Sequence, residues 1–360
     1  MTAIGKNPLF CLKFNFMKLQ ELCTSLEEWA PLAYQESYDN SGLIVGDLST
    51  ELNGVLVSLD CVEDVIDEAI AKGCNAIVSH HPIVFKGLKS FTGKNYVERT
   101  VLKAIKNDIA LYAIHTNLDN IHTGVNKMLA DKIGLINTSV LVPKKEIIKQ
   151  LVTYVRVAEA DLVRNSLFEI GAGSLGEYSE CSFTVSGKGT FKGSENSNPV
   201  IGEKGVFKKL EEERIEILFP AHMEASVLSV LKNSNTYEEV AYSMFTISNE
   251  NQNVGSGMLG ELSIAENALD FLGVLKNNLN SEGIRYTSLV KNKIKKVAIC
   301  GGAGSFLLQA AIRSGADIFI TGDFKYHEFF DAENKIIIAD VGHYESEQYT
   351  KDLIADFLRK

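Results

Sequence analysis

The stretch AIVSHHP, residues Ala76 to Pro82, decides the fold of this chain. An apolar run with the character of a buried strand ends there in two adjacent histidines and a proline. Proline has no backbone N–H to give to a sheet, so Pro82 marks the end of regular strand pairing. Because side chains alternate along a strand, His80 and His81 can share one site only where that geometry ends. The alternative is one histidine on the surface and one satisfied in the core, and the pair by itself leaves both interpretations open.

Strands and helices alternate on both sides of this stretch. The pattern predicts, in order, the strand Gly54 to Leu59, the helix Val62 to Lys72, the helix Tyr96 to Asn107 and the strand Ala110 to Ile114. A strand, a helix and a second strand in this order are typical of a parallel sheet in an α/β domain. In such sheets ligands bind beyond the carboxyl ends of the strands, which is where the two histidines stand.

The segments before these strands carry further polar candidates. A first helix is predicted from Met17, and the sixteen residues before it are expected to be a loose arm or an artefact of start-codon choice. In the polar turn that follows this helix, Asp39 and Asn40 serve either the turn or the cleft. Asp60, at the end of the strand Gly54 to Leu59, is expected to be the N-cap of the next helix.

The bulk composition excludes several classes of protein. A chain of 360 residues, 45% hydrophobic and 23% charged, is expected to be soluble and to form about two domains. Its net charge of -10 disfavours nucleic-acid partners, because it provides no basic field for phosphate backbones. The six cysteines form no CxxC pair, which argues against a disulfide framework or a thiolate zinc site and fits a reducing cytoplasm. We find no signal peptide and no apolar run long enough for a membrane span, so no membrane partner is expected.

The middle of the chain predicts a separate α+β unit. Its pattern gives a β-α-β-β-α-β order, which is typical of a ferredoxin-like domain. The predicted elements are the strand Ile148 to Val157, the helix Asp161 to Ile170, a strand or hairpin over Cys181 to Val185 and Gly189 to Lys192, the strand Arg214 to Phe219, the helix Ala221 to Lys232 and the strand Glu239 to Phe245. Since His222 is its one histidine, we expect assembly or regulation from this unit, or else the sensing of a small molecule.

The α/β pattern resumes in the last third of the chain. It predicts the helix Asn267 to Leu279, the strand Lys295 to Cys300, the helix Phe306 to Arg313, the strands Asp317 to Thr321 and Lys335 to Asp340, and a closing helix. The segment GGAGS after Cys300 is either a phosphate cradle or a tight strand-to-helix turn, and the missing third glycine and lysine favour the turn. TGDFKYHE places Asp323 and His327 at one strand end, and HYESE places His343 and Glu347 four residues apart on one helix face.

These strand ends together predict a metal centre. Six of the seven histidines lie near them, namely His80, His81, His115, His122, His327 and His343. Histidine mixed with carboxylate suits zinc, manganese or iron, and the sequence does not choose among them. Because a carboxylate can bridge two cations and an imidazole nitrogen binds one, the mixture suggests two divalent metal ions per subunit.

Five motifs carry a resemblance to a known family. In chain order, they are YDNSGLIVGD, SHHPIVFKG, IHTNLDN, TGDFKYHE and DVGHYESE. Together they resemble the GTP cyclohydrolase I type 2 homologues, also called YbgI-type or Nif-three-like dinuclear-metal-centre proteins. The middle segments EIGAGSLGEYSECSF and FPAHMEASVLSVLKNSNTYEEVAY resemble the CutA-like or PII-like insert of the longer bacterial members.

The resemblance implies a fold, a ligand set and an assembly. The fold is a discontinuous α/β core, residues 1–145 and 247–360, around a dinuclear metal site, with an inserted ferredoxin-like (PII/CutA-like) domain at 146–246. The assembly it implies is a toroidal homohexamer. The metal ligands it implies are His80, His81, Asp119, His343 and Glu347.

A dinuclear centre favours hydrolysis, because two cations can acidify a water and hold it against an electrophile. His327 or Asp323 would then move protons as catalytic residues, and Lys325 or the GGAGS amides would neutralise a phosphate. Alternatively, Asp323 is a turn residue bonded to its own backbone and His327 orients a ligand. We predict metal-dependent hydrolysis of a nucleotide or other phosphorylated metabolite. The competing hypothesis is a non-enzymatic metal-binding regulator or adaptor, and a DNA-binding regulator is disfavoured by the charge.

Overall fold

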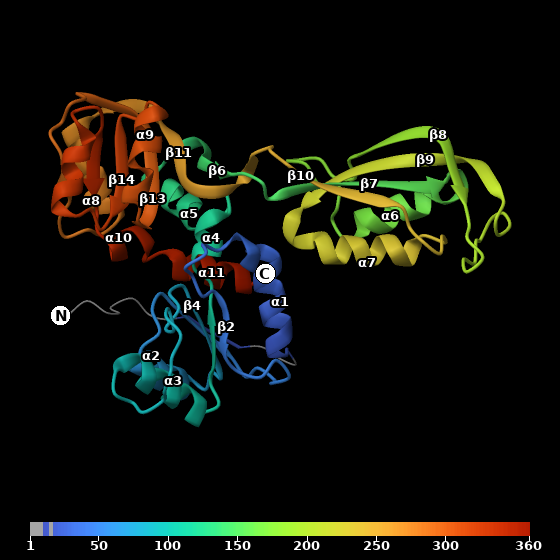
Figure 1. Cartoon of the computed structure of the whole chain (residues 1–360). Helices are drawn as coiled ribbons and strands as arrows, with labels where there is room; N and C mark the ends of the chain where they lie inside the picture. Colours follow the sequence, from blue (N-terminus) through green and yellow to red (C-terminus); the bar gives the residue numbers. More distant parts are fainter. Residues whose placement is uncertain (1–9, 14–16) are drawn as a thin grey trace. The chain divides into compact units, whose positions relative to one another are not determined.

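The computed structural model describes residues 10–13 and 17–360 and divides the chain into two compact units. Unit 1 contains residues up to 142 together with residues 253–360, and unit 2 contains residues 143–252. Figure 1 colours the chain from blue to red, so that unit 1 is seen to combine both ends of the sequence. The resemblance implied boundaries at 145/146 and 246/247. The first lies just beyond β6 (Ile136–Lys144), and the second lies inside β10 (Tyr242–Ile247).

The N-terminal part of unit 1 forms a five-stranded sheet. In sheet order its strands are β1 (Phe10–Leu12), β3 (Val55–Ser58), β4 (Ala76–Ser79), β5 (Ala110–Ala113) and β2 (Gly42–Val45). The central strands β3, β4 and β5 are parallel, and the edge strands β1 and β2 are antiparallel to their neighbours. The residues of the three central strands are all buried, which explains their continuous apolar runs.

Helices α2 (Glu63–Lys72) and α3 (Tyr96–Lys106) connect these parallel strands and pack against each other. Helix α2 ends at Gly73 in the left-handed conformation with φ +65°, as the sequence predicts. The Asn95 side chain accepts a hydrogen bond from the backbone N–H of Glu98 and so caps α3. The end of α2 and the start of α3 are therefore set by local chemistry.

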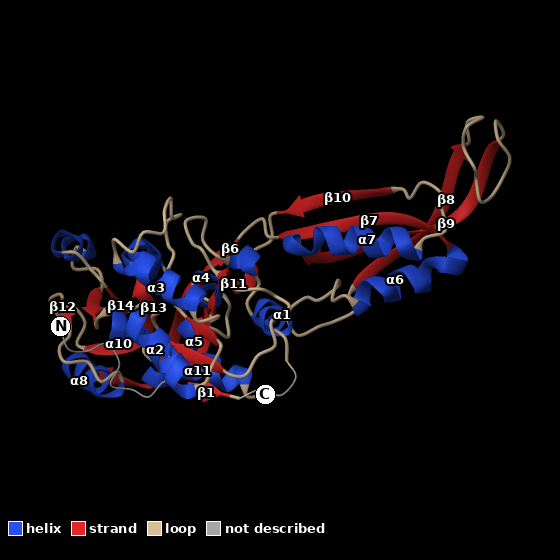
Figure 2. Ribbon diagram, turned by 90° about the horizontal axis from the view of Figure 1, so that it is seen from below, coloured by secondary structure: helices blue, strands red, loops and turns tan. Residues whose placement is uncertain are grey.

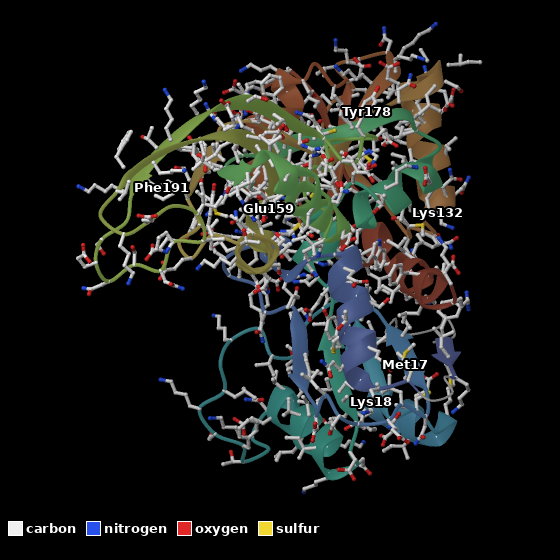
Figure 3. All side chains as sticks on the ribbon, turned by 90° about the vertical axis from the view of Figure 1, so that its right-hand side faces the viewer. Met17, Lys18, Lys132, Glu159, Tyr178 and Phe191 are labelled. Atoms are coloured by element: carbon white, nitrogen blue, oxygen red, sulfur yellow. The ribbon has the colours of Figure 1, made fainter. Side chains whose placement is uncertain are left out.

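The expectation of a loose N-terminal arm is wrong for residues 10–12, because Phe10–Leu12 pair with β3 as strand β1. Residues 1–9 and 14–16 lie outside the described part of the chain. Helix α1 (Leu19–Trp29) begins just after Lys18, which Figure 3 labels and whose backbone N–H donates to the Glu21 carboxylate. Its buried face consists of leucines and a cysteine.

The C-terminal part of unit 1 forms a six-stranded sheet. In sheet order its strands are β12 (Arg285–Tyr286), β15 (Ile337–Asp340), β14 (Ile318–Gly322), β13 (Lys293–Ala303), β11 (Asn251–Asn267) and β6 (Ile136–Lys144). Strands β13, β14 and β15 are parallel, and β11 and β12 are antiparallel to their partners. The other α-helices in the described part of unit 1 are α4 (Thr116–Asn120), α5 (Val125–Ile133), α8 (Ala268–Asn278), α9 (Leu308–Arg313), α10 (His343–Glu347) and α11 (Thr350–Leu358).

Unit 2 contains six elements in the predicted β-α-β-β-α-β order. They are β7 (Ile148–Arg156), α6 (Ala160–Glu169), β8 (Ser182–Lys192), β9 (Phe207–Pro220), α7 (Glu224–Ser234) and β10 (Tyr242–Ile247). The sheet order is β10-β7-β9-β8, and Figures 1 and 2 show α6 and α7 on one face of it. Residues 182–192 form one continuous strand rather than a hairpin, because β9 pairs with all of it.

A core of aliphatic side chains lies between the helices and the sheet of unit 2, with Leu151, Val163, Ile217, Val227 and Leu231 fully or almost fully buried. This core gives unit 2 its own hydrophobic interior, as an independent domain requires. None of the helices in the described residues combines the length and the apolar character needed to cross a lipid bilayer.

Candidate metal centre

Two strand ends of the N-terminal sheet bring three histidines together. His80 and His81 follow β4, and His115 follows β5. The ring centroids are 4.9 Å apart for His80 and His81, 5.2 Å for His80 and His115, and 5.4 Å for His81 and His115. The alternative of one surface and one core histidine is therefore wrong, because both members of the pair face the same cluster. The side chain of His80 is fully buried and that of His81 is 23% exposed.

Helix α10 adds His343 and Glu347 to this cluster from the other end of the chain. Their four-residue spacing places both on one face, as predicted, with Glu347 Oε2 3.0 Å from His343 Nε2. The same oxygen lies 3.0 Å from His81 Nε2, and Oε1 lies 3.8 Å from His80 Nε2. The Glu347 side chain is only 3% exposed, and its one carboxylate faces three imidazoles.

Asp119 completes the cluster from the short helix α4. Its Oδ1 atom lies 3.6 Å from His80 Nε2, which is too long for a hydrogen bond. Both of these atoms are buried and have no hydrogen-bond partner in the described structure. Buried polar atoms almost always have a partner, so two facing orphans indicate that something else satisfies both.

An outer set of oxygen atoms fixes the orientation of the four histidine rings. In each ring Nδ1 bonds an oxygen, and Nε2 is left for the cluster. The acceptors are the Ile114 carbonyl for His80 at 2.8 Å, Asp60 for His81 at 2.7 Å, Asp39 for His115 at 2.8 Å and Asp323 for His343 at 2.8 Å. Metal-binding histidines typically show this arrangement, because the outer bond selects the tautomer and holds the ring.

Two aspartates bond histidines of the cluster; the expectation for Asp60 is wrong, and for Asp39 one of the two open alternatives is confirmed. Asp60 is not the N-cap of α2, since Val62 occupies that position and the Asp60 carboxylate bonds His81. Asp39 serves the cleft, because it bonds His115 as well as the backbone N–H and hydroxyl of Thr116. Asp60 and His81 each lie two residues beyond the paired Ser58 and Ser79, so adjacent parallel strand ends bring them together. The contact of Asp39 with His115 depends instead on the pairing of the edge strand β2 with β5.

The two predicted catalytic residues lie in different surroundings. Asp323 has φ +58° and bonds His343 rather than its own backbone, so it is placed to orient a ring of the cluster. His327 lies in the 3-10 helix Tyr326–Ala332, and its ring contacts within the described residues are with Tyr326 and Phe330. The structure does not bring His327 into the cluster, and its role in proton transfer stays a prediction.

His115 is the cluster member that the resemblance did not name as a ligand. The sequence signal was nevertheless present, because His115 is the first polar residue after a buried strand next to β4. His115 forms one group of potential ligands with His80 and His81, whose nitrogen atoms lie within 4.8 Å of one another. Two further groups meet the same limit, namely His81, His343 and Glu347, and His80, Asp119 and Glu347.

Burial and neighbouring charges shift the pKa values of several side chains in the cluster. Burial lowers the pKa of His81, but hydrogen bonds with Asp60 and Glu347 outweigh it and raise that pKa to about 10. The hydrogen bond with Glu347 also raises the pKa of His343 to about 9. Burial raises the pKa of Glu347, but the three histidines outweigh this effect and hold it well below its usual range. A cation that binds here would therefore have to displace protons from His81 and His343.

The pKa of Asp119 shifts upward, in contrast to that of Glu347. Its side chain keeps 23% exposure, yet protein atoms surround the carboxylate closely. This desolvation, together with the charge of Glu347, raises the pKa of Asp119 to about 7. A second carboxylate beside Glu347 is costly unless positive charge separates the two.

The GGAGS segment packs against the cluster rather than forming a phosphate cradle. The backbone N–H groups of Gly301, Gly302 and Gly304 donate to Asn126, Ser346 and Thr321 side chains, so these amides are already used. A Cβ atom on Gly302 would lie 2.3 Å from Glu347 Oε1. The segment is thus a close turn that makes room for the Glu347 carboxylate.

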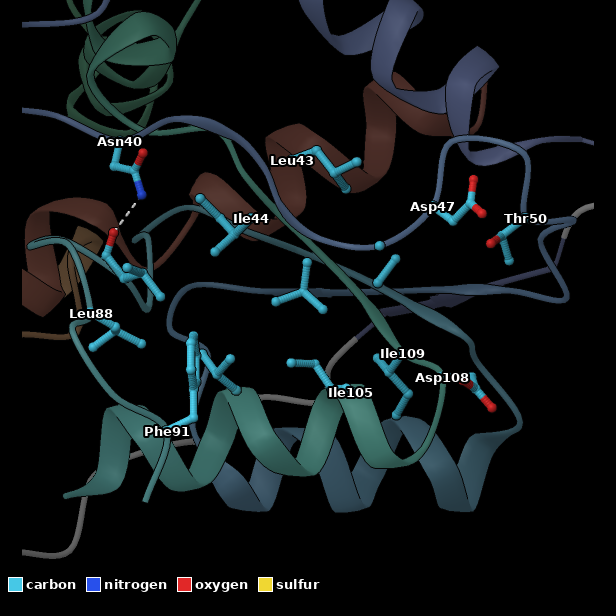
Figure 4. A pocket seen from close by; sticks show the side chains of 15 residues that line it. Asn40, Leu43, Ile44, Asp47, Thr50, Leu88, Phe91, Ile105, Asp108 and Ile109 are labelled. Atoms are coloured by element: carbon cyan, nitrogen blue, oxygen red, sulfur yellow. Dashed lines mark hydrogen bonds between the residues drawn. The ribbon is translucent and has the colours of Figure 1, made fainter. Parts of the chain in front are cut away.

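A cavity of about 670 Å³ lies near the cluster but contains none of its histidines. Figure 4 shows its lining of mostly apolar side chains from β2, α3 and the loop between β4 and α3, including Leu43, Phe91 and Ile105. Asn40 at its edge donates through Nδ2 to the Val84 carbonyl at 2.6 Å. This bond ties the turn that carries Asp39 to the loop that follows His81.

The cluster fits a divalent cation by the chemistry of its donors. It offers imidazole Nε2 atoms and carboxylate oxygens within 4.8 Å of one another, and two of its buried donor atoms have no partner in the described residues. These are the donor types that zinc, manganese and iron accept.

Comparison with known proteins identifies the family. A family model described as Duf34/NIF3 (NGG1p interacting factor 3) matches residues 17–360. The protein named GTP cyclohydrolase 1 type 2 homolog in Bacillus subtilis (strain 168) is 37% identical over 327 residues, covering 90% of this chain and 88% of that protein. The crystal structure of a Bacillus cereus protein related to NIF3 is 35% identical, with a TM-score of 0.83 over 96% of this chain and 94% of that chain.

A Staphylococcus aureus crystal structure is also similar, with 31% identity and a TM-score of 0.76 over 96% of this chain and 94% of that chain. The resemblance inferred from the five motifs is confirmed by these matches, as is the mixed α/β character of the fold. The chain belongs to the Duf34/NIF3 family.

Proposed function

We propose that unit 1 is a metal-dependent hydrolase centre that holds two divalent cations. The observation that carries this proposal is that two of the ligand groups share one residue, Glu347. One group adds His81 and His343 to it, and the other adds His80 and Asp119. A carboxylate with two oxygens can serve one cation with each, which an imidazole cannot do.

The bound cations would supply Lewis acidity toward a phosphoryl oxygen and lower the pKa of water at the site. The residues around the cations would hold the ligand side chains in one orientation. Asp60 and Asp323 hold the rings of His81 and His343 through Nδ1, so Nε2 of each ring stays directed at Glu347. Rigid ligand orientation of this kind is worth about 10–100-fold in metal affinity.

We assign proton transfer to His115 rather than to His327. His115 lies within the cluster, its Nδ1 is fixed by Asp39 and its side chain is 16% exposed, so its Nε2 can exchange a proton with a bound molecule. A histidine held in this way can give a proton to the leaving oxygen when a phosphoester bond is cleaved. Water gives its hydroxyl group to phosphorus, the alcohol leaves with the proton from His115, and the remaining proton of the water restores the protonated His115.

Two exposed aromatic rings beside the cluster favour a substrate with a planar ring. Tyr38 is 60% exposed and Phe85 is 46% exposed, and their ring centroids are 6.1 Å apart. The Phe85 ring also lies edge-on to His115 at 6.4 Å. Burial and the charges of Glu36 and Asp119 raise the pKa of Tyr38, so its hydroxyl group stays protonated beside the acidic cluster.

The exposed Lys86 follows Phe85 directly and has no ion-pair partner among the described residues, so it can meet a phosphate. Stacking of a base on aromatic rings contributes about 1–3 kcal/mol per base. A nucleotide combines such a ring with a phosphate, and the proposed substrate class is therefore a nucleotide or another phosphorylated metabolite with a planar ring.

A turnover assay tests this function. Protein loaded with zinc, manganese or iron is given GTP, other nucleotides, a phosphodiester and non-aromatic sugar phosphates. Glu347→Gln should abolish turnover of all substrates. Tyr38→Ala should raise KM for nucleotides by about 5–150-fold, the equivalent of one stacked base. Tyr178→Ala is the matched control, because Tyr178 is 76% exposed and lies in unit 2. Equal KM values for Tyr38→Ala and the control would refute the stacking role.

A second candidate is a non-enzymatic metal-binding regulator or adaptor. Unit 2 favours this candidate, because all groups of potential metal ligands in the described residues lie in unit 1. Unit 2 is therefore left for a role other than metal binding, such as contact with a partner. Unit 2 also exposes large apolar side chains on its strands, including Phe183, Phe207 and Phe245. Complete metal loading without turnover of any substrate in the panel would support this candidate over the hydrolase.

We also infer that unit 2 is a ferredoxin-like domain of the PII or CutA kind. Its element order and its sheet order β10-β7-β9-β8 support this, because the ferredoxin-like fold pairs its first strand with its third and fourth. The toroidal homohexamer implied by the motifs stays a prediction. Light scattering of the purified protein tests it directly.

A further inference from the structure

Two cysteines far apart in the sequence face each other at the edge of the N-terminal sheet. Cys11 Sγ lies 2.8 Å from Cys74 Sγ, although 63 positions separate the residues. Cys11 is the central residue of β1 and is paired with Leu56 of β3. Cys74 follows Gly73 at the end of α2 and is 4% exposed. The contact thus joins the first strand to the start of the segment that leads into β4.

The surroundings of the pair hold the two sulfur atoms in place. Lys13 Nζ donates to the carbonyl oxygens of Lys72 and Gly73 at 2.9 Å each, which fixes the end of β1 against the end of α2. A Cβ atom on Gly54 would lie 3.3 Å from Cys74 Sγ and 3.0 Å from the Leu12 carbonyl oxygen. A side chain at position 54 would require these neighbours to shift by a few tenths of an ångström, so the glycine favours the close approach of the two segments.

We infer that Cys11 and Cys74 are a modification site, at which a low-molecular-weight disulfide such as oxidised glutathione forms a reversible intramolecular disulfide. A disulfide requires sulfurs about 2.03–2.05 Å apart, so the two atoms have to approach by less than 1 Å. Such a small shift lies within ordinary side-chain motion. The pair is therefore arranged for the reaction before the oxidant arrives.

The reaction proceeds in two thiol–disulfide exchanges. Cys11 is the more accessible thiol, and its thiolate attacks one sulfur of oxidised glutathione and releases one glutathione. Cys74 then loses its proton and attacks the Cys11 sulfur, which releases the second glutathione. The two cysteines together lose two electrons and two protons, and oxidised glutathione gains both. Burial, followed by the contact with Cys11, raises the pKa of Cys74, which makes Cys74 the second nucleophile rather than the first.

The remaining cysteines provide an internal comparison. Within residues 10–13 and 17–360 the structure records no other pair of cysteine sulfurs in contact. Cys181 is half-buried like Cys11, and its Sγ bonds the Ser179 carbonyl rather than another sulfur. Cys181 should therefore form at most a mixed disulfide with glutathione, and it should not form an intramolecular disulfide.

Mass spectrometry of the full chain tests the inference. The protein is reduced with a phosphine, treated with oxidised glutathione, alkylated and digested. Wild-type protein should lose two alkylation sites and yield a linked peptide that contains Cys11 and Cys74. Cys11→Ser should abolish the linked peptide, and Cys181→Ser should keep it. Alkylation of Cys11 to the same extent as Cys181, with no linked peptide, would overturn the inference.

A stability measurement on the same samples provides a second readout. The disulfide closes a long loop in the unfolded chain, so oxidation should raise Tm by about 5 °C or more and reduction should reverse this. Cys11→Ser should show no such rise, and this variant is expected to fold because position 11 is only half-buried. An equal rise in wild-type protein and Cys11→Ser would show that oxidation acts elsewhere and would also overturn the inference.

Discussion

Replacing Gly302 with alanine perturbs the proposed metal centre through a single methyl group. Gly302 has φ +63°, and a Cβ atom there would lie 2.3 Å from Glu347 Oε1 and 3.3 Å from His343 Cε1. Contacts of Cβ atoms under 3.0 Å essentially never occur, so the carboxylate has to move by most of an ångström. That shift removes Glu347 from a position where it faces three imidazoles.

We expect Gly302→Ala to weaken zinc binding by at least about tenfold, because even the loss of an outer partner of a ligand costs about 10–100-fold. The variant should also lose about 1–2 kcal/mol of unfolding free energy, since a residue with a side chain is strained in the left-handed region. Zinc affinity is measured by competition with a chelator, and stability by urea unfolding of the metal-free protein.

Gly315→Ala separates these two effects. Gly315 has φ +75°, and nothing lies within 4 Å of the position of its Cβ atom. It should therefore lose a similar amount of unfolding free energy and bind zinc as the wild type does. If Gly302→Ala bound zinc within twofold of the wild type and of Gly315→Ala, the assignment of Glu347 as a ligand would be refuted.

Three further predictions concern pH, ligand orientation and unit 2. Zinc affinity should rise between pH 6 and pH 9, because the pKa values of His81 and His343 are raised to about 10 and about 9 and a cation has to displace their protons. Calorimetry in buffers of different ionisation enthalpy measures this proton release. If no protons were released on zinc binding at pH 7, the raised pKa values would be contradicted. Asp39→Asn should slow turnover more than it weakens zinc binding, since it removes the charge that orients His115, and the ratio of kcat to zinc affinity measures this. Leu231→Ala should destabilise unit 2 by about 2–5 kcal/mol in urea unfolding and leave zinc affinity unchanged, because Leu231 is fully buried in the core of unit 2.

The candidate site was largely predictable because parallel strands place their carboxyl ends along one edge of a sheet. The rule located His80, His81 and His115 from the ends of β4 and β5 without any knowledge of packing. The helical spacing of His343 and Glu347 likewise gave their common face. Local periodicity determines both features, and local periodicity can be read in a sequence.

Features that depend on contacts between distant segments were not predictable. Strand β11 (Asn251–Asn267) escaped the pattern because glycines interrupt it, and one of them, Gly260, allows Leu135 to approach: an added Cβ would lie 3.0 Å from Leu135 Cβ. Strand β1 has only three residues, and its position depends on pairing with β3. The partnership of Asp39 with His115 depends on the edge strand β2, which pairs with β5 from a distant part of the chain.

The bond between His81 and Glu347 spans 266 positions of the chain, and this separation bears on when a cation can be acquired during synthesis. A nascent polypeptide that ends before Glu347 has two neighbouring histidines and Asp119 but lacks the carboxylate that faces them. Contacts between such distant residues are expected to form late, because the entropy lost in closing so large a loop is offset only when the whole unit packs. We therefore expect the proposed centre to acquire cations only late in synthesis, once the segment that carries Glu347 has been translated.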